Sequence, residues 1–236
     1  MIANIKLRSL SLLVSCGVAL SAFSGSRYEY VTVPNDPMDT KMYTLDNGLK
    51  VYMTVNKGEP RIQTYIAVRV GSKNDPAETT GLAHYLEHLM FKGTVNFGTT
   101  NYHAEKPLLD AIEAQFEIYR NTTDEAQCKA IYHVIDSLSY EASTYFIPNE
   151  YAMLMTAIGA TGTNATTTYD VTCYKENIPN NQVENWAKIQ ADRFENMVIR
   201  GFHTELETVY EERNMYAAHD DDKVFEAVMS SLFPNH

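Results

Sequence analysis

The sequence predicts an α+β domain in which an antiparallel-rich sheet carries helices packed on one face. Three features support this fold class: a turn signal between alternating apolar residues, runs of β-branched residues, and several segments with apolar residues at helical spacing. The chain has 236 residues, of which 44% are apolar, an ordinary composition for a globular protein. This length suits one large domain or two small ones.

Three regions are expected to form strands. Met42 to Met53 should form a hairpin, because alternating apolar residues lie on both sides of the turn sequence Asp46-Asn47-Gly48. The segment 61–70 is a second candidate. The segment 164–174 is rich in Thr, Tyr and Val, and we predict a single strand there.

Helices are expected first around the stretch 81–94, which Gly93 closes, and then in the long segment 106–147. The long segment has two apolar stripes separated by polar residues, so we predict an inserted helical hairpin whose second helix is capped by Thr123 or Asp124.

Further along, the segment 151–157 is a short helix or turn, and 182–196 has the pattern of an amphipathic helix. The last long helix should begin at Thr204, with Glu207 completing a capping box, and should reach at least Met215.

The N-terminus has the pattern of an export signal, which we place at residues 1–24. Basic residues precede a short apolar run from Leu10 to Ala22. Two cleavage alternatives stay open: a small-x-small site at Ala22-Phe23-Ser24, or a lipobox ending in Cys16, which would carry a lipid anchor. Either way we expect an exported protein, periplasmic or an outer-membrane-associated lipoprotein, with a linker at 25–38 before a domain at 39–236.

The net charge is −11, which makes nucleic acid or an anionic membrane surface a poor partner. Apart from Cys16, the chain has two cysteines, Cys128 and Cys173. Their separation does not match a metal-binding pattern, and the sequence leaves open whether they pair.

The stretch 81–94 contains the strongest functional signal. His84 and His88 are four residues apart, so a helix would place both imidazoles on one face, with Glu87 beside them. Two neutral imidazoles suit Zn²⁺, and a carboxylate beside the metal can take a proton from zinc-bound water. This is the H-x-x-E-H order of inverzincins. The alternative is a solvated polar face. Four residues are expected to form the apolar side of this helix: Leu82, Leu86, Leu89 and Met90.

A catalytic zinc site usually has a third protein ligand. The best region for it is the helix from Thr204, where Glu205 and Glu212 are seven residues apart and therefore share a face. Spacing alone leaves the choice among the acidic residues from 205 to 212 open, and a solvated acidic face is the alternative.

The chain resembles the pitrilysin (insulinase) family of zinc endopeptidases, which includes insulin-degrading enzyme and the mitochondrial processing peptidase. Four stretches carry the resemblance, namely 44–49, 81–94, 164–168 and 205–212.

The resemblance implies a role for each matched residue. His84, His88 and Glu212 would hold one Zn²⁺ per chain, and Glu87 would be the general base. Glu205 matches a carboxylate that supports the site. Asn164 and Ala165 match the edge strand on which such enzymes lay the substrate backbone.

Three departures from the family pattern stand out. His88 and Glu212 are further apart than in the best-known relatives, which the hairpin at 106–147 accounts for, as in a bacterial exported subgroup. Thr166 stands where some relatives have an aromatic residue, so side-chain preference does not carry over. Relatives continue beyond the position of His236 and add an Arg/Tyr pair from a later domain that has no counterpart here. We therefore expect only an N-terminal catalytic domain, truncated at its C-terminus.

The sequence thus predicts a zinc-dependent metalloendopeptidase domain acting on peptides or unfolded segments. The alternative is a truncated or non-catalytic pitrilysin-like subunit that needs a second such domain or chain for activity. On either view the isolated chain should be weak or inactive.

Overall fold

A computed structural model describes residues 28–234 of the chain. The predicted signal peptide and Cys16 lie outside the described residues. The chain divides into two compact units, one ending at Gly58 and one beginning at Glu59. The predicted domain at 39–236 spans residues of both units.

The first unit is a three-stranded antiparallel sheet of β1 (Tyr30–Thr32), β2 (Lys41–Thr44) and β3 (Lys50–Met53), in that order. The predicted hairpin is present, and Gly48 supplies the positive φ of 87° that its turn requires. β1 lies within the segment expected to be a linker. The linker prediction relied on two prolines, and both follow this strand.

The second unit contains a separate sheet of β4 (Arg61–Val68), β6 (Thr172–Pro179) and β5 (Thr161–Thr167), in that order and antiparallel throughout. The prediction of one strand over 164–174 was therefore wrong. A turn closed by the hydrogen bond from Thr168 N to Val171 O (2.8 Å) divides it into a hairpin. β-branched residues lie on both sides of the turn, so composition alone did not reveal it.

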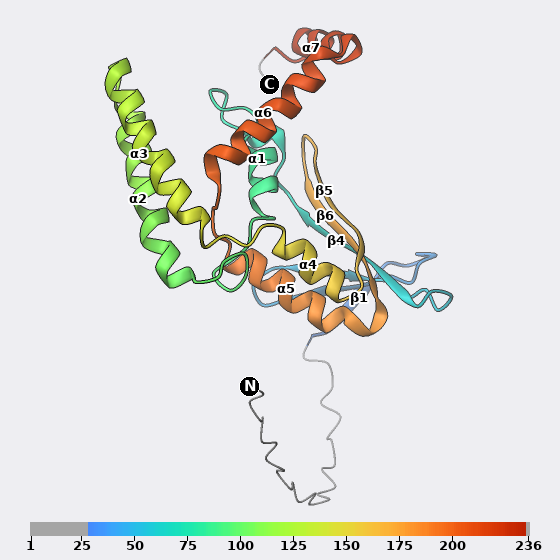
Figure 1. The fold of residues 1–236 in the computed structure, drawn as a ribbon. Helices are drawn as coiled ribbons and strands as arrows, with labels where there is room; N and C mark the ends of the chain where they lie inside the picture. Colours follow the sequence, from blue (N-terminus) through green and yellow to red (C-terminus); the bar gives the residue numbers. More distant parts are fainter. Residues whose placement is uncertain (1–27, 235–236) are drawn as a thin grey trace, which may run out of the picture. The chain divides into compact units, whose positions relative to one another are not determined.

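Helices cover one face of this second sheet (Figure 1). They are α1 (Leu82–Leu89), α4 (Glu150–Ala157) and α5 (Val183–Glu195). Short 3₁₀ turns precede α1 at Ser72–Asn74 and α5 at Asn180–Gln182. Alternate residues of β6 are buried, as expected for a strand with one covered face: Thr172, Tyr174, Glu176 and Ile178.

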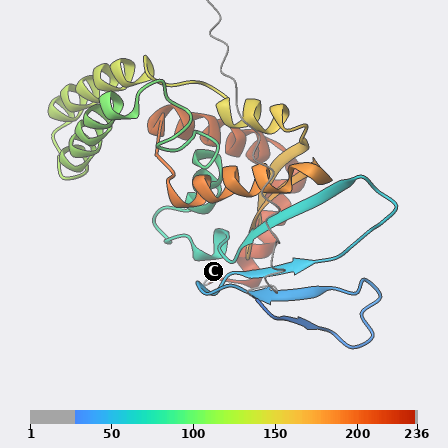
Figure 2. The same ribbon diagram turned by 90° about the horizontal axis from the view of Figure 1, so that it is seen from below.

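The predicted helical hairpin consists of α2 (Tyr102–Arg120) and α3 (Glu125–Ser143). Both views show it projecting from the rest of the second unit (Figures 1 and 2). α2 starts four residues before the predicted boundary because the side chain of Asn101 caps it by accepting from Ala104 N. Asp124 caps α3 in the same way.

The last two helices of the described residues are α6 (Phe202–Ala218) and α7 (Asp220–Leu232). The predicted capping box at Thr204 was wrong, since the helix begins two residues earlier after Gly201, which has a φ of 60°. Thr204 Oγ1 instead donates to the Gly201 carbonyl. The extended backbone of His219 separates α6 from α7.

Buried side chains of the second unit form two apolar clusters beneath the sheet, centred on Met90 and Tyr174 and on Tyr151 and Met155. Cys128 and Cys173 are both free thiols. Across residues 28–234, every helix falls short of the length and apolar character that a bilayer-spanning helix requires.

Candidate metal centre

The helix α1 carries the two histidines, and its start is fixed by an upstream carboxylate. Asp75 accepts hydrogen bonds from the backbone N–H groups of Gly81 (2.7 Å) and Ala83 (2.9 Å). These are N–H groups that the start of a helix leaves unsatisfied, and a negative charge there also suits the helix dipole.

The covered face of α1 differs from the predicted one. Leu89 and the following Met90 are buried as expected, but Leu82 and Leu86 are 48% and 43% exposed. Ala83, Tyr85 and Glu87 are buried in their place. The spacing argument assigned the covered face by hydrophobicity alone, whereas the sheet covers the side on which Glu87 lies.

The exit of α1 and the entry to α6 lie next to each other. Thr94 forms an isolated antiparallel bridge with Met197, and Val198 N donates to Gly93 O (3.2 Å). Gly93 has a φ of 111°, and a Cβ there would come within 2.5 Å of the Phe97 carbonyl oxygen. This close approach within the loop after α1, together with the positive φ, requires glycine at position 93.

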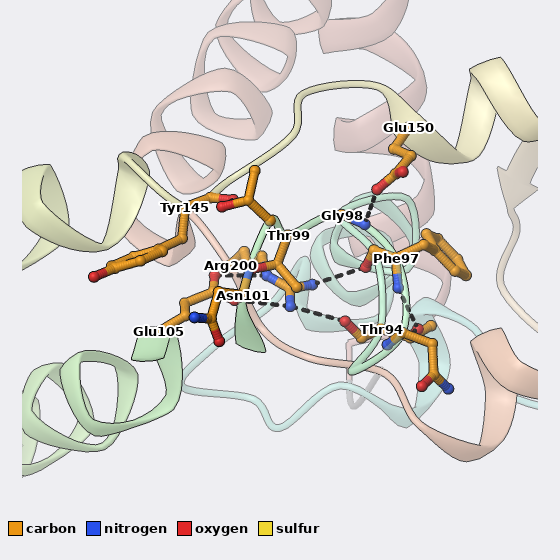
Figure 3. A network of polar contacts seen from close by, with 11 residues as sticks. Thr94, Phe97, Gly98, Thr99, Asn101, Glu105, Tyr145, Glu150 and Arg200 are labelled. Carbon is orange, nitrogen blue, oxygen red and sulfur yellow. Dashed lines mark hydrogen bonds and ion pairs between the residues drawn. The ribbon is translucent and has the colours of Figure 1, made fainter. Parts of the chain in front are cut away.

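A buried arginine holds this junction in place (Figure 3). Arg200, just before α6, donates to the Thr94 carbonyl oxygen (2.8 Å) and to both carboxylate oxygens of Glu105 (2.7 and 3.0 Å). Arg200 and Glu105 are only 2% and 1% exposed. The pair joins α2, the loop after α1 and the start of α6. Neither residue was singled out from the sequence, since they are far apart along it.

Three predicted ligands converge as a result. Nε2 of His84 and Nε2 of His88 are 3.1 Å apart, and each lies 3.6 Å from Oε2 of Glu212. The point equidistant from these atoms lies about 2 Å from each, the length of zinc–nitrogen and zinc–carboxylate bonds. Two imidazoles and one carboxylate are also a donor set that catalytic zinc uses, so these residues fit the ion.

The predicted supporting carboxylate lies on the far side of one imidazole. Oε1 of Glu205 is 2.9 Å from Nδ1 of His88, and its other oxygen contacts Lys92 Nζ. Burial raises the pKa of the Glu205 carboxyl, but hydrogen bonds from Lys92 and His88 outweigh that effect, so the pKa lies below its ordinary value. Glu205 and Glu212 do share the covered face of α6, as predicted, while Glu207 and Glu211 are exposed. The sequence interpretation missed Lys92, although it lies one turn after His88.

Glu87 is buried on the sheet side of α1. Its Oε2 accepts a hydrogen bond from Thr167 Oγ1 at 2.6 Å, while Oε1 has no hydrogen-bond partner within the described part of the chain. Thr167 lies at the end of β5, the strand that carries Asn164 and Ala165. On that strand Asn164 is exposed and Ala165 is buried. β5 is at an edge of its sheet, as the prediction for Asn164 and Ala165 requires.

The fold and this site together define an α+β domain with a His-His-Glu donor set contributed by two helices. The profile described as Insulinase (Peptidase family M16) matches residues 50–115 and 121–236 of the sequence. The chain therefore belongs to the insulinase family of peptidases, and the resemblance to this family is confirmed.

Individual relatives match over shorter stretches. An insulin-degrading enzyme homolog of Dictyostelium discoideum is 29% identical over 119 residues, which cover 48% of this chain and 12% of that protein. The uncharacterized zinc protease YmxG of Bacillus subtilis is 33% identical over 54 residues, covering 23% and 13% of the two chains. The chain thus spans only a small part of the length of these relatives.

Solved structures support the fold. A protease from Helicobacter pylori superimposes with a TM-score of 0.51 at 20% identity, covering 75% of this chain and 31% of that one. Pitrilysin superimposes with a TM-score of 0.50 at 17% identity, covering 81% and 16%. The predicted fold class is confirmed.

Proposed function

We propose that this chain carries the zinc site of a metalloendopeptidase, with one Zn²⁺ held by His84, His88 and Glu212. The observation that carries the proposal is the convergence of these three donor atoms from α1 and α6. Membership of a peptidase family and relatives named as zinc proteases support the same function.

The reaction follows from the chemistry of the site. When bound, zinc supplies a Lewis acid that polarises a peptide carbonyl and acidifies water to a pKa of about 7. Glu87 is the general base: it takes a proton from the attacking water and passes it to the leaving amine. Oε1, which lacks a hydrogen-bond partner among the described residues, is the oxygen available for that transfer, because Thr167 occupies Oε2.

The edge of β5, unpaired within residues 28–234, defines the substrate class that we propose. An extended peptide or unfolded segment can add to this edge as a further strand, with backbone hydrogen bonds near Asn164 and Ala165. Such binding depends on the backbone of the substrate and leaves its side-chain sequence open.

The second candidate is a subunit that needs a partner chain or a further pitrilysin-like domain for activity. It is favoured by the match to relatives named as subunits, such as the mitochondrial-processing peptidase subunit beta of Lentinula edodes, which is 33% identical over 93 residues. On this view the chain alone binds zinc but cleaves weakly or not at all. We also propose that the chain belongs to a bacterial exported subgroup of the family.

A peptide-cleavage assay separates the candidates. Residues 25–236, loaded with zinc, are assayed against a flexible fluorogenic peptide, alone and with a complementing C-terminal chain. Cleavage by residues 25–236 alone that Glu87→Gln abolishes supports an autonomous peptidase. Cleavage only with the added chain supports the subunit. Absence of cleavage in both, with zinc bound, contradicts both catalytic accounts.

We further propose export through the N-terminal segment. Mass spectrometry of the mature protein tests this directly. A lipid-modified N-terminal Cys16 would indicate a lipoprotein, an N-terminus near residue 25 would indicate a soluble periplasmic protein, and an intact Met1 would contradict export.

A further inference from the structure

We propose that Thr167 is a positioning residue for the general base, so that the strand receiving the substrate also aligns the catalytic carboxylate. This inference rests on the proposed function. It starts from the hydrogen bond of 2.6 Å that Thr167 Oγ1 donates to Oε2 of the buried Glu87. The two residues are 80 positions apart in the sequence.

The direction of this hydrogen bond is set by its surroundings. A threonine hydroxyl has one proton to donate, and an ionised carboxylate only accepts. The neighbouring hydroxyl of Thr172 lies 3.3 Å from that of Thr167 and donates to the Val70 carbonyl oxygen at 2.9 Å. Because the Thr172 hydroxyl donates its proton to the Val70 carbonyl, the Thr167 hydroxyl donates its own proton to Glu87.

Anchoring one oxygen restricts the carboxylate to one rotamer. A free glutamate side chain samples several rotamers, and ordering a long side chain costs conformational entropy. With Oε2 held by Thr167, Glu87 keeps Oε1 in a fixed position without support from substrate. Such preorganisation favours the reactive geometry before substrate binds.

The strand β5 then has two functions. Ala165 and Thr167 are two residues apart and point to the same covered face, while the outer edge of the strand is unpaired within residues 28–234. A peptide that pairs with this edge immobilises the backbone that carries the Thr167 hydroxyl. A peptide bound along β5 in the correct register therefore stabilises the position of the Glu87 carboxylate.

Two substitutions test the hydroxyl. Thr167→Val removes it with little change in shape, and Thr167→Ser keeps it. Thr163→Val, at a partly buried position of β5 and without a side-chain hydrogen bond to the described residues, is the matched control. The measurements are the zinc dissociation constant, kcat and KM on a fluorogenic peptide with the complementing chain present, and crystal structures of each variant.

We expect Thr167→Val to lower kcat by about 10- to 100-fold, the usual range for a lost supporting contact. KM and zinc affinity should stay within about twofold, and Thr167→Ser should recover most of kcat. The Glu87 carboxylate should leave its position in Thr167→Val and keep it in Thr167→Ser and Thr163→Val.

Two results would overturn the inference: unchanged kcat in Thr167→Val, or a Glu87 carboxylate that keeps its position in that variant. If the zinc-loaded wild-type chain cleaves no peptide at all, the proposed function fails separately. The position of Glu87 in the crystal structures then still decides the role of Thr167.

Discussion

Oε1 of Glu205 lies 2.9 Å from Nδ1 of His88, on the opposite side of the imidazole from the Nε2 that faces His84. Donation from Nδ1 to this carboxylate leaves the lone pair of Nε2 free for a metal ion and fixes the orientation of the ring. The same helix thus carries both the carboxylate of the proposed metal site, Glu212, and the carboxylate that contacts His88, Glu205.

Glu205→Ala should weaken zinc binding by about 10- to 100-fold, because His88 loses the acceptor that orients its ring. A competition titration with a chromophoric chelator measures the dissociation constant. Glu207→Ala, an exposed position on the same helix, is the control and should bind zinc like the wild type. Equal zinc affinity in Glu205→Ala and the wild type would show that Glu205 does not support the metal site through His88.

Glu105→Gln should destabilise the second unit by about 3–5 kcal/mol, because it leaves the Arg200 guanidinium buried without its carboxylate partner. Urea denaturation measures the free energy of unfolding. Glu117→Gln, which breaks an exposed pair with Arg120, should change it by less than about 1 kcal/mol. Similar losses in both variants would contradict the importance of burial at Arg200.

Alkaline pH should destabilise the fold through Tyr174. Burial raises the pKa of its hydroxyl to about 12, since the lowering by the Arg193 guanidinium is outweighed and Glu87 raises it further. The unfolded chain loses this proton near pH 10 and the folded chain only near pH 12, so stability should fall as pH rises through that interval. The loss attributable to Tyr174 is on the order of 2–3 kcal/mol.

Urea denaturation of the wild type and Tyr174→Phe at pH 9 and pH 11 checks this prediction. The variant lacks the ionisable hydroxyl, so the decrease between the two pH values should be smaller for it. An equal decrease in both proteins would show that Tyr174 does not carry the effect.

How far the sequence could predict this protein depends on the range of each interaction. The shared face of His84 and His88 and that of Glu205 and Glu212 follow from helical periodicity, which is local. The choice of Glu212 as the third ligand came only from the family resemblance, because spacing did not distinguish it from the other acidic residues between 205 and 212.

Interactions between distant segments were missed. The hydrogen bond from Thr167 to Glu87 and the ion pair of Arg200 with Glu105 join residues 80 and 95 positions apart, and neither has a periodic signature. The β5–β6 turn was missed for a related reason: pairing between neighbouring strands, rather than composition, defines where each strand ends.

The most direct test of the central claim is the zinc content of the purified chain, measured by mass spectrometry of the metal after dialysis. The wild type and the control His103→Ala, at an exposed position on α2, should hold about one zinc per chain, as expected for the one three-ligand group found within residues 28–234. His88→Ala and Glu212→Ala should hold little or none. Equal zinc in the wild type and His88→Ala would contradict the site and the peptidase function inferred from it.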